Sequence, residues 1–134
     1  MADDSMEEAF STVGAEQSWH EIDHRLMLLL TPLFSADDAT IELTVVVDGT
    51  VISGSVVSEQ AWVQRQNDQI RIGSPALADA FKALEPTAGL KKQDRYIHFL
   101  EPVLLSGGVH VRMPATRVDL RKVAAWSIGR VAAD

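Results

Sequence analysis

A β-hairpin pattern at residues 41–56 constrains the fold more than any other feature of the chain. Apolar residues alternate with others along its first half, which is the period of a strand with one buried face. The apolar positions are Ile41, Leu43, Val45 and Val47. Asp48-Gly49 follows them, and this dipeptide favours a two-residue type I′ turn because both of its positions need a positive φ. The pattern therefore predicts two antiparallel strands joined by a tight turn.

The two-residue turn also fixes the register of the hairpin. If Val47 pairs with Thr50, then Leu43 lies opposite Gly54, and one face of both strands is apolar. The other predicted pairs on this face are Val45 with Ile52 and Ile41 with Val56. We expect Gly54 to leave room for Leu43 or for a bend of the sheet, because glycine has no side chain to pack there.

The length of 134 residues predicts one main domain. A chain of this size buries roughly two-thirds of its unfolded surface, and 46% of the residues are hydrophobic, so a core can form without cross-links. Zero cysteines exclude disulfides, thiolate metal ligands and cysteine nucleophiles. The longest apolar run, at residues 26–30, is too short to cross a bilayer, and the acidic N-terminus lacks the basic region of a signal peptide. We expect a cytoplasmic protein without membrane contact.

Residues 18–33 carry the pattern of an amphipathic helix. Ser18 and Glu21 have the spacing of a capping box, in which each side chain binds the backbone amide of the other residue. Apolar residues then recur at three- and four-residue intervals, which predicts one buried stripe. They are Trp19, Ile22, Leu26, Leu29, Leu30 and Leu33. Residues 1–16 contain five acids and few bulky apolar residues, so we predict a flexible acidic arm there and a single α+β domain at 17–134.

Residues 58–85 have the pattern of a helical insertion after the hairpin. Ser58 is placed to cap one helix, in which Trp62 and Val63 are the apolar anchors. Ser74 is placed to cap a second helix, with Pro75 in its first turn. We expect this second helix to bury one stripe, formed by Leu77, Phe81 and Leu84.

The rest of the chain is rich in β-type residues. We predict strands at residues 96–105, 109–113, 116–120 and 123–131, with a turn at 106–108. The order of helix, hairpin, helical insertion and strands predicts an α+β fold, with the N-terminal helix on an antiparallel sheet. A helix before a bent hairpin with a glycine in mid-strand also resembles the start of small Sm-like barrels. We therefore expect the sheet to curve into a small, partly open barrel.

One motif has the spacing of a zinc site. His20, Glu21 and His24 form H-E-x-x-H, in which two histidines one helical turn apart bind zinc and the glutamate activates a metal-bound water. However, Asp23 places a charge inside the motif, and Glu21 already has a role in the predicted capping box. We predict a solvated helix start with no metal and no cofactor. A zinc-dependent hydrolase is the alternative.

No segment predicts catalytic residues. The sequence contains no G-x-S-x-G motif, which would place a serine nucleophile on a sharp turn. The small-residue segments at 53–55 and 106–108 lack the lysine and the following helix of a phosphate-binding loop. They are more simply interpreted as a bend in a strand and a hairpin turn.

Charge is distributed unevenly along the chain. The formal net charge is −7, and it divides into −11 over residues 1–90 and +4 over residues 91–134. We expect four residues of the basic part to contact partners, and the opposite charges to favour homo-oligomers. These four residues are Arg117, Arg121, Lys122 and Trp126. Bases beside an aromatic residue also occur in RNA-binding small barrels, which is a second alternative, although the acidity of the chain opposes phosphate binding.

Three segments carry a family resemblance. The hairpin contains Val51-Ile52-Ser53-Gly54, the next segment reads Tyr96-Ile97-His98-Phe99, and a basic segment from Leu120 ends in Trp126-Ser127-Ile128-Gly129. In this order, from about residue 40 to residue 131, they resemble the gas vesicle accessory protein GvpU family. That family has an I-S-G-T-like strand after a turn glycine, an I-H step after an aromatic or aliphatic residue, and a basic strand that ends in V-x-x-F-x-L-G. Trp126 replaces the phenylalanine of that last pattern.

The resemblance implies a non-enzymatic accessory factor of gas vesicles, the protein-shelled buoyancy organelles of some microbes. Such a factor would act in vesicle assembly or association through contacts with gas vesicle proteins or with the shell. It would be located in the cytoplasm together with the vesicles. The residues alone lead to a compatible expectation, because they contain no reliable catalytic set and no cofactor motif.

Overall fold

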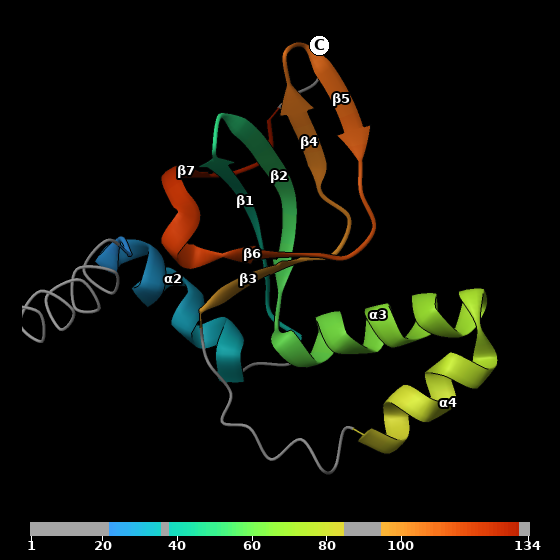
Figure 1. Cartoon of the computed structure of the whole chain (residues 1–134). Helices are drawn as coiled ribbons and strands as arrows, with labels where there is room; N and C mark the ends of the chain where they lie inside the picture. The colour runs from blue at the N-terminus through green and yellow to red at the C-terminus, as the bar shows by residue number, and fades with distance from the viewer. Residues whose placement is uncertain (1–21, 36–37, 85–94, 132–134) are drawn as a thin grey trace, which may run out of the picture.

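The computed structural model describes residues 22–35, 38–84 and 95–131, which form the predicted α+β fold (Figure 1). The helices are α2 (His24–Ser35), α3 (Glu59–Gly73) and α4 (Pro75–Leu84). The strands are β1 (Thr40–Val47), β2 (Thr50–Val57), β3 (Tyr96–Phe99), β4 (Val103–Ser106), β5 (Val109–Arg112), β6 (Thr116–Asp119) and β7 (Val123–Ile128), and a 3-10 turn, η2, covers Leu120–Lys122. The strand pairs of the described chain are all antiparallel.

The hairpin of β1 and β2 has the predicted register. Leu43 pairs with Gly54, and Val45 pairs with Ile52. Asp48 and Gly49 have φ values of 50° and 79°, as a type I′ turn requires. The alternating pattern and the turn dipeptide were therefore sufficient to fix this part of the fold.

β2 changes its neighbour at Gly54. Residues 51–53 pair with β4, whereas Val56 pairs with β3. A Cβ on Gly54 would lie only 3.0 Å from Cα of Pro102, so the backbone of the β3–β4 connection fills the space that glycine leaves. The space at Gly54 is thus taken by Pro102 rather than by Leu43.

The result is an open, barrel-like sheet with the order β5-β4-β2-β1-β7, in which β3 also pairs with β2 and with β6. Two predicted strand boundaries were wrong. The segment 96–105 forms two strands, because the chain turns at residues 100–102 and Pro102 has no N–H for a β-ladder. The last strand ends at Ile128, because Gly129 has a φ of 111° that strands do not adopt.

One hydrophobic core lies between α2 and the sheet. Four residues of the predicted stripe are buried in it, which are Ile22 just before α2 and Leu26, Leu30 and Leu33 within α2. Leu29 is partly buried against them, and Trp19 lies outside the described residues. The strands and η2 contribute Leu43, Val45, Ile52, Val56, Ile97, Phe99, Val118 and Leu120. Among the largest side chains in this core, Phe99 and Leu43 have no exposed surface. The periodicities of 3.6 in the helix and 2 in the hairpin thus identified the faces that meet.

The start of the N-terminal helix differs from the prediction. Ile22 and Asp23 precede α2, and the Asp23 carboxylate caps it by accepting hydrogen bonds from the amides of Arg25 (2.8 Å) and Leu26 (3.1 Å). A helix that began at Ser18 would be continuous through Asp23, and it is not. Ser18 and Glu21 themselves, like the predicted arm at 1–16, lie outside the described residues.

The helical insertion between β2 and β3 is present, and both of its helices have the predicted serine caps. The amide of Ala61 donates to Ser58 Oγ (3.1 Å), and the amide of Leu77 donates to Ser74 Oγ (3.2 Å). Trp62 of α3 is buried as predicted. Figure 1 shows α3 and α4 extending together beyond the strands.

The predicted burial of the α4 stripe was wrong. Leu77, Phe81 and Leu84 are 56%, 43% and 63% exposed. The helix packs on α3, and its buried residue is the small Ala78, so the larger apolar residues lie on the outside. The amphipathic pattern was correctly recognised, but it does not state whether the chain itself covers the apolar face.

Candidate interaction surfaces

The structure describes only the last three residues of the H-E-x-x-H motif. His20 and Glu21 lie outside the described residues, and His24 is exposed at the first position of α2. A helical pair of histidines needs a continuous turn between them, whereas Asp23 caps the helix within the motif. Within residues 22–35, 38–84 and 95–131, no group of three or more His, Cys, Asp or Glu side chains is arranged to hold a metal ion.

Arg117, predicted to contact partners, fastens the helical insertion to the sheet. The carbon of its guanidinium group lies 4.6 Å from the ring centroid of Trp62 on α3 and 5.0 Å from that of Tyr96 on β3. The carboxylate of Glu59, at the start of α3, lies 3.9 Å from the same guanidinium group. Cation–π contacts of this kind contribute about 0.5–1 kcal/mol each at exposed sites and more when they are desolvated.

His98 completes this junction beneath the insertion. It is buried, and its ring centroid lies 5.3 Å from that of Trp62. Burial, and secondarily the positive charge of Arg117, lower the pKa of His98 to about 4. Neither Nε2 of His98 nor Nε1 of Trp62 has a hydrogen-bond partner in the described part of the chain. The junction therefore contains a neutral imidazole at physiological pH.

Asp119 binds two other guanidinium groups. Arg121 donates to it through Nε (3.3 Å) and Nη2 (3.0 Å), and Arg95 donates through Nη2 (3.1 Å). Asp119 also caps η2 by accepting the amide of Arg121 at 3.0 Å. Lys122 is exposed next to this group. Arg121 and Lys122 thus lie together, with Arg121 bound to a carboxylate that it shares with Arg95.

The C-terminal residues 129–131 cross the face of β1 and β2 that points away from α2. The amide of Val131 donates to Ser53 Oγ (2.9 Å), and the Thr44 hydroxyl donates to the Gly129 carbonyl (2.7 Å). Arg130 forms an ion pair with Glu42. A hydrogen bond from Ser55 and this ion pair lower the pKa of the Glu42 carboxyl. Of the six bases that the structure describes after residue 94, Arg95, Arg117, Arg121 and Arg130 therefore bind within the molecule.

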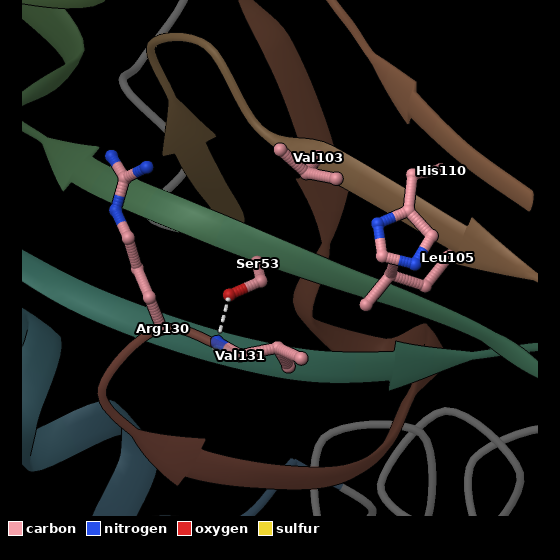
Figure 2. A pocket seen from close by; sticks show the side chains of 6 residues that line it. All are labelled: Ser53, Val103, Leu105, His110, Arg130 and Val131. Atoms are coloured by element: carbon pink, nitrogen blue, oxygen red, sulfur yellow. Dashed lines mark hydrogen bonds between the residues drawn. The ribbon is translucent and has the colours of Figure 1, made fainter. Parts of the chain in front are cut away.

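A small pocket lies beside this crossing segment. Figure 2 shows Ser53, Val103, Leu105, His110, Arg130 and Val131 around it, with the hydrogen bond between Ser53 and Val131 at its base. Its volume is about 50 Å³, whereas pockets for organic ligands usually have about 300–1,000 Å³. The pocket is accordingly a packing defect between the tail and β4 rather than a ligand site.

Trp126 lines a larger apolar groove between α2 and β7. The groove has a volume of about 250 Å³ and is lined by Arg25, Leu28, Leu29, Trp126 and Ile128. A hydrogen bond from the Trp126 indole lowers the pKa of the Asp23 carboxyl at the start of α2. Trp126 also packs partly against the core, as expected for the closing strand. This side chain thus joins the helix cap, the core and the groove.

The four residues predicted to contact partners do not form one surface. Arg117 contacts α3, Arg121 and Lys122 lie at η2, and Trp126 contacts α2. Sequence reasoning instead missed the exposure of the α4 stripe and the groove beside Trp126. A signal for the groove was present, because Leu28 is apolar but lies outside the stripe that α2 packs on the sheet.

Comparison with known proteins adds a family match. A protein-family model described as gas vesicle protein GvpU-like matches residues 23–131. No curated protein and no solved structure matches the chain. In the part of the chain that the structure describes, no helix is long and apolar enough to cross a membrane.

Proposed function

The chain belongs to the GvpU-like family of gas vesicle proteins, and we propose that it is a non-enzymatic accessory protein that acts in vesicle assembly or association through protein–protein contacts. Its location is the cytoplasm, together with the gas vesicles. The match extends from the cap of α2 to the segment that crosses β1 and β2, so it includes the helical insertion. We therefore expect the contacts with gas vesicle proteins on the surfaces of these elements.

The exposed stripe of α4 is the observation that carries this proposal. Leu77, Phe81 and Leu84 recur at four- and three-residue spacing, so they lie on one side of the helix. An amphipathic helix of this kind binds by laying its apolar face into a groove of a partner. Because the chain belongs to a family of gas vesicle proteins, we assign the partner of this stripe to the gas vesicle shell or its proteins.

The basic residues at η2 make a smaller contribution to the same role. Lys122 is exposed and Arg121 is partly exposed, so together they attract an acidic partner surface at low ionic strength. Arg117 and Trp126 support the contact indirectly, because they hold the insertion and β7 in place. Salt should consequently weaken vesicle binding but not abolish it.

A flotation assay tests the role of α4. Gas vesicles rise on centrifugation, so a bound protein is recovered in the floating layer. We expect the wild-type chain to float with purified vesicles and the double variant Leu77→Glu/Phe81→Glu to remain in solution. Lys82→Glu, a charge change on the same helix, is the control and should float. If the double variant floats as well as the wild type, α4 is not the contact; if the wild type does not bind vesicles, the proposed function is wrong.

A further inference from the structure

The open sheet has three outer strands in the described structure, and they differ in charge. β5, β6 and β7 each pair with one neighbour. β5 ends in Arg112, and β6 contains Arg117 and Asp119. β7, with the sequence VAAWSI, contains neither a charge nor a proline, and its pairing with β1 is regular over residues 125–128, beyond the register shift next to Val123. Proteins usually protect such edges with charged residues or proline, because the unpaired N–H and C=O groups of an edge strand pair readily with another strand.

We propose that β7 is the contact surface between two copies of this chain. The two β7 strands pair antiparallel about a two-fold axis, so the two sheets become one. Symmetric pairing of the same surface on each copy is the commonest form of oligomer. This inference does not depend on the gas vesicle role, because it rests on the edge of the sheet and on the groove beside it.

The groove between α2 and β7 supports this pairing. Trp126 and Ile128 pair with Val45 and Leu43 of β1, so they lie on the same face of the sheet as the core. The groove opens at this edge, where Leu28 and Ile128 are 59% and 65% exposed. A second β7 added at the edge brings its own apolar residues over the groove, and the groove of the second copy is covered in return.

The charges at this edge favour a second copy as the occupant. An uncharged strand pairs with itself without the like-charge repulsion that directly opposed residues would cause. At the end of the groove each copy carries one carboxylate, Asp23, and one guanidinium group, Arg25. A two-fold axis at Ser127, which places each Trp126 opposite Ile128 of the second copy, therefore brings together two opposite pairs of charges, whose sum is zero.

The edge strand β5 offers a matched comparison. Val109 of β5 is 61% exposed. It pairs with Ser106, which lies on the same face of β4 as Leu104, and Leu104 pairs with Ile52 on the core face of β2. Val109 and Ile128 therefore lie on the same face of the sheet. The two side chains are thus similar in type, exposure and face, but β5 has Arg112 and His110 within its four residues. Only the β7 edge is expected to pair.

Light scattering coupled to size-exclusion chromatography tests the proposal on the full chain. We expect the wild type to have the mass of a dimer at micromolar concentration, Ile128→Lys to have the mass of a monomer, and the control Val109→Lys to remain a dimer. A monomeric wild type overturns the proposal. The proposal is also overturned if Ile128→Lys still has the mass of a dimer, or if Val109→Lys has the mass of a monomer. Circular dichroism of each variant establishes that it is folded.

A cross-linking experiment gives a result that does not depend on a disruptive variant. The chain has no cysteine, so a single introduced cysteine can bond only to its counterpart in a second copy. Ser127→Cys, in β7, should form a disulfide-linked dimer under mild oxidation within minutes, and Val109→Cys should not. Equal cross-linking of the two variants contradicts the proposal, and so does capture of β7 by another protein in place of a second copy.

Discussion

The two helices of the insertion differ in the exposure of their apolar side chains. In α3, Trp62 is buried against His98 and covered by the guanidinium group of Arg117. In α4, the stripe of Leu77 and Phe81 faces outward. Both helices nevertheless begin with a serine whose hydroxyl accepts a hydrogen bond from the amide three residues later. The local signals that start a helix are therefore equal, and the difference arises from what lies next to each one.

This difference separates a structural face from a binding face. Burial of Trp62 contributes to the stability of the monomer, because it removes apolar surface from water when the chain folds. The α4 stripe contributes little to that stability, because its side chains remain in water until a partner covers them. The comparison predicts that substitutions in α3 unfold the protein, whereas substitutions in α4 change binding only.

The largest expected effect is that of Trp62→Ala. Removal of a buried tryptophan side chain costs about 3–5 kcal/mol, and here it also removes the stacking partner of Arg117 and His98. We expect a loss of this size in the free energy of unfolding, measured by urea denaturation. The control Phe81→Ala, at a position 43% exposed, should lose less than about 1 kcal/mol. Equal losses in the two variants would show that the two helices are packed alike.

The next largest effect is a loss of stability in acid that depends on His98. Its pKa is about 4 in the folded chain and about 6.5 when unfolded, so only the unfolded chain takes up a proton between these values. Stability should therefore be constant above pH 6.5, fall by about 3 kcal/mol as the pH decreases to 4, and be level below it.

Urea titrations at several pH values measure this acid dependence. In His98→Phe, which keeps a ring against Trp62 but cannot ionise, the decrease between pH 6.5 and 4 should be smaller by the same amount. His110→Phe, at an exposed position of β5, is the control and should keep the wild-type dependence. If His98→Phe and the wild type have parallel pH profiles, His98 does not control the acid sensitivity.

The sequence predicted the parts of the fold that local patterns determine. The register around Asp48 and Gly49 follows from a turn in which only two residues are involved, and the α2 stripe follows from its own periodicity. The break at Pro102 was missed, because it depends on the close approach of that residue to Gly54, which is 48 positions earlier in the chain. Contacts at such sequence separation leave no periodic pattern.

The candidate surfaces were harder to predict for a related reason. Basic residues in the C-terminal part indicated partner contacts, but Arg121 and Arg130 bind Asp119 and Glu42 of the same chain. The sequence gives the number of charges and not their partners. The α4 stripe was correctly recognised as apolar, and its exposure became apparent only when the position of α3 was known.

A smaller effect is expected at Arg117, which joins the two regions. Arg117→Met keeps an apolar stem against Trp62 but removes the charge that faces two rings and Glu59. We expect a loss of about 1–2 kcal/mol in the free energy of unfolding, measured by urea denaturation. The control Arg112→Met, on the exposed edge strand β5, should change it by less than about 0.5 kcal/mol. If neither substitution changes the free energy of unfolding, the stack does not fasten α3.

The smallest effect on stability is expected for Leu84→Gln at the end of α4. This side chain is 63% exposed, and substitutions at exposed positions usually change the free energy of unfolding by no more than about 0.5 kcal/mol. Binding of a hydrophobic dye should decrease in the same variant, because the exposed stripe with Leu77 and Phe81 becomes shorter. Leu26→Gln, on the buried stripe of α2, should instead lose several kcal/mol, as buried polar substitutions do. A loss above about 2 kcal/mol for Leu84→Gln would show that the monomer itself buries the α4 stripe, and the distinction between the two helices would then be wrong.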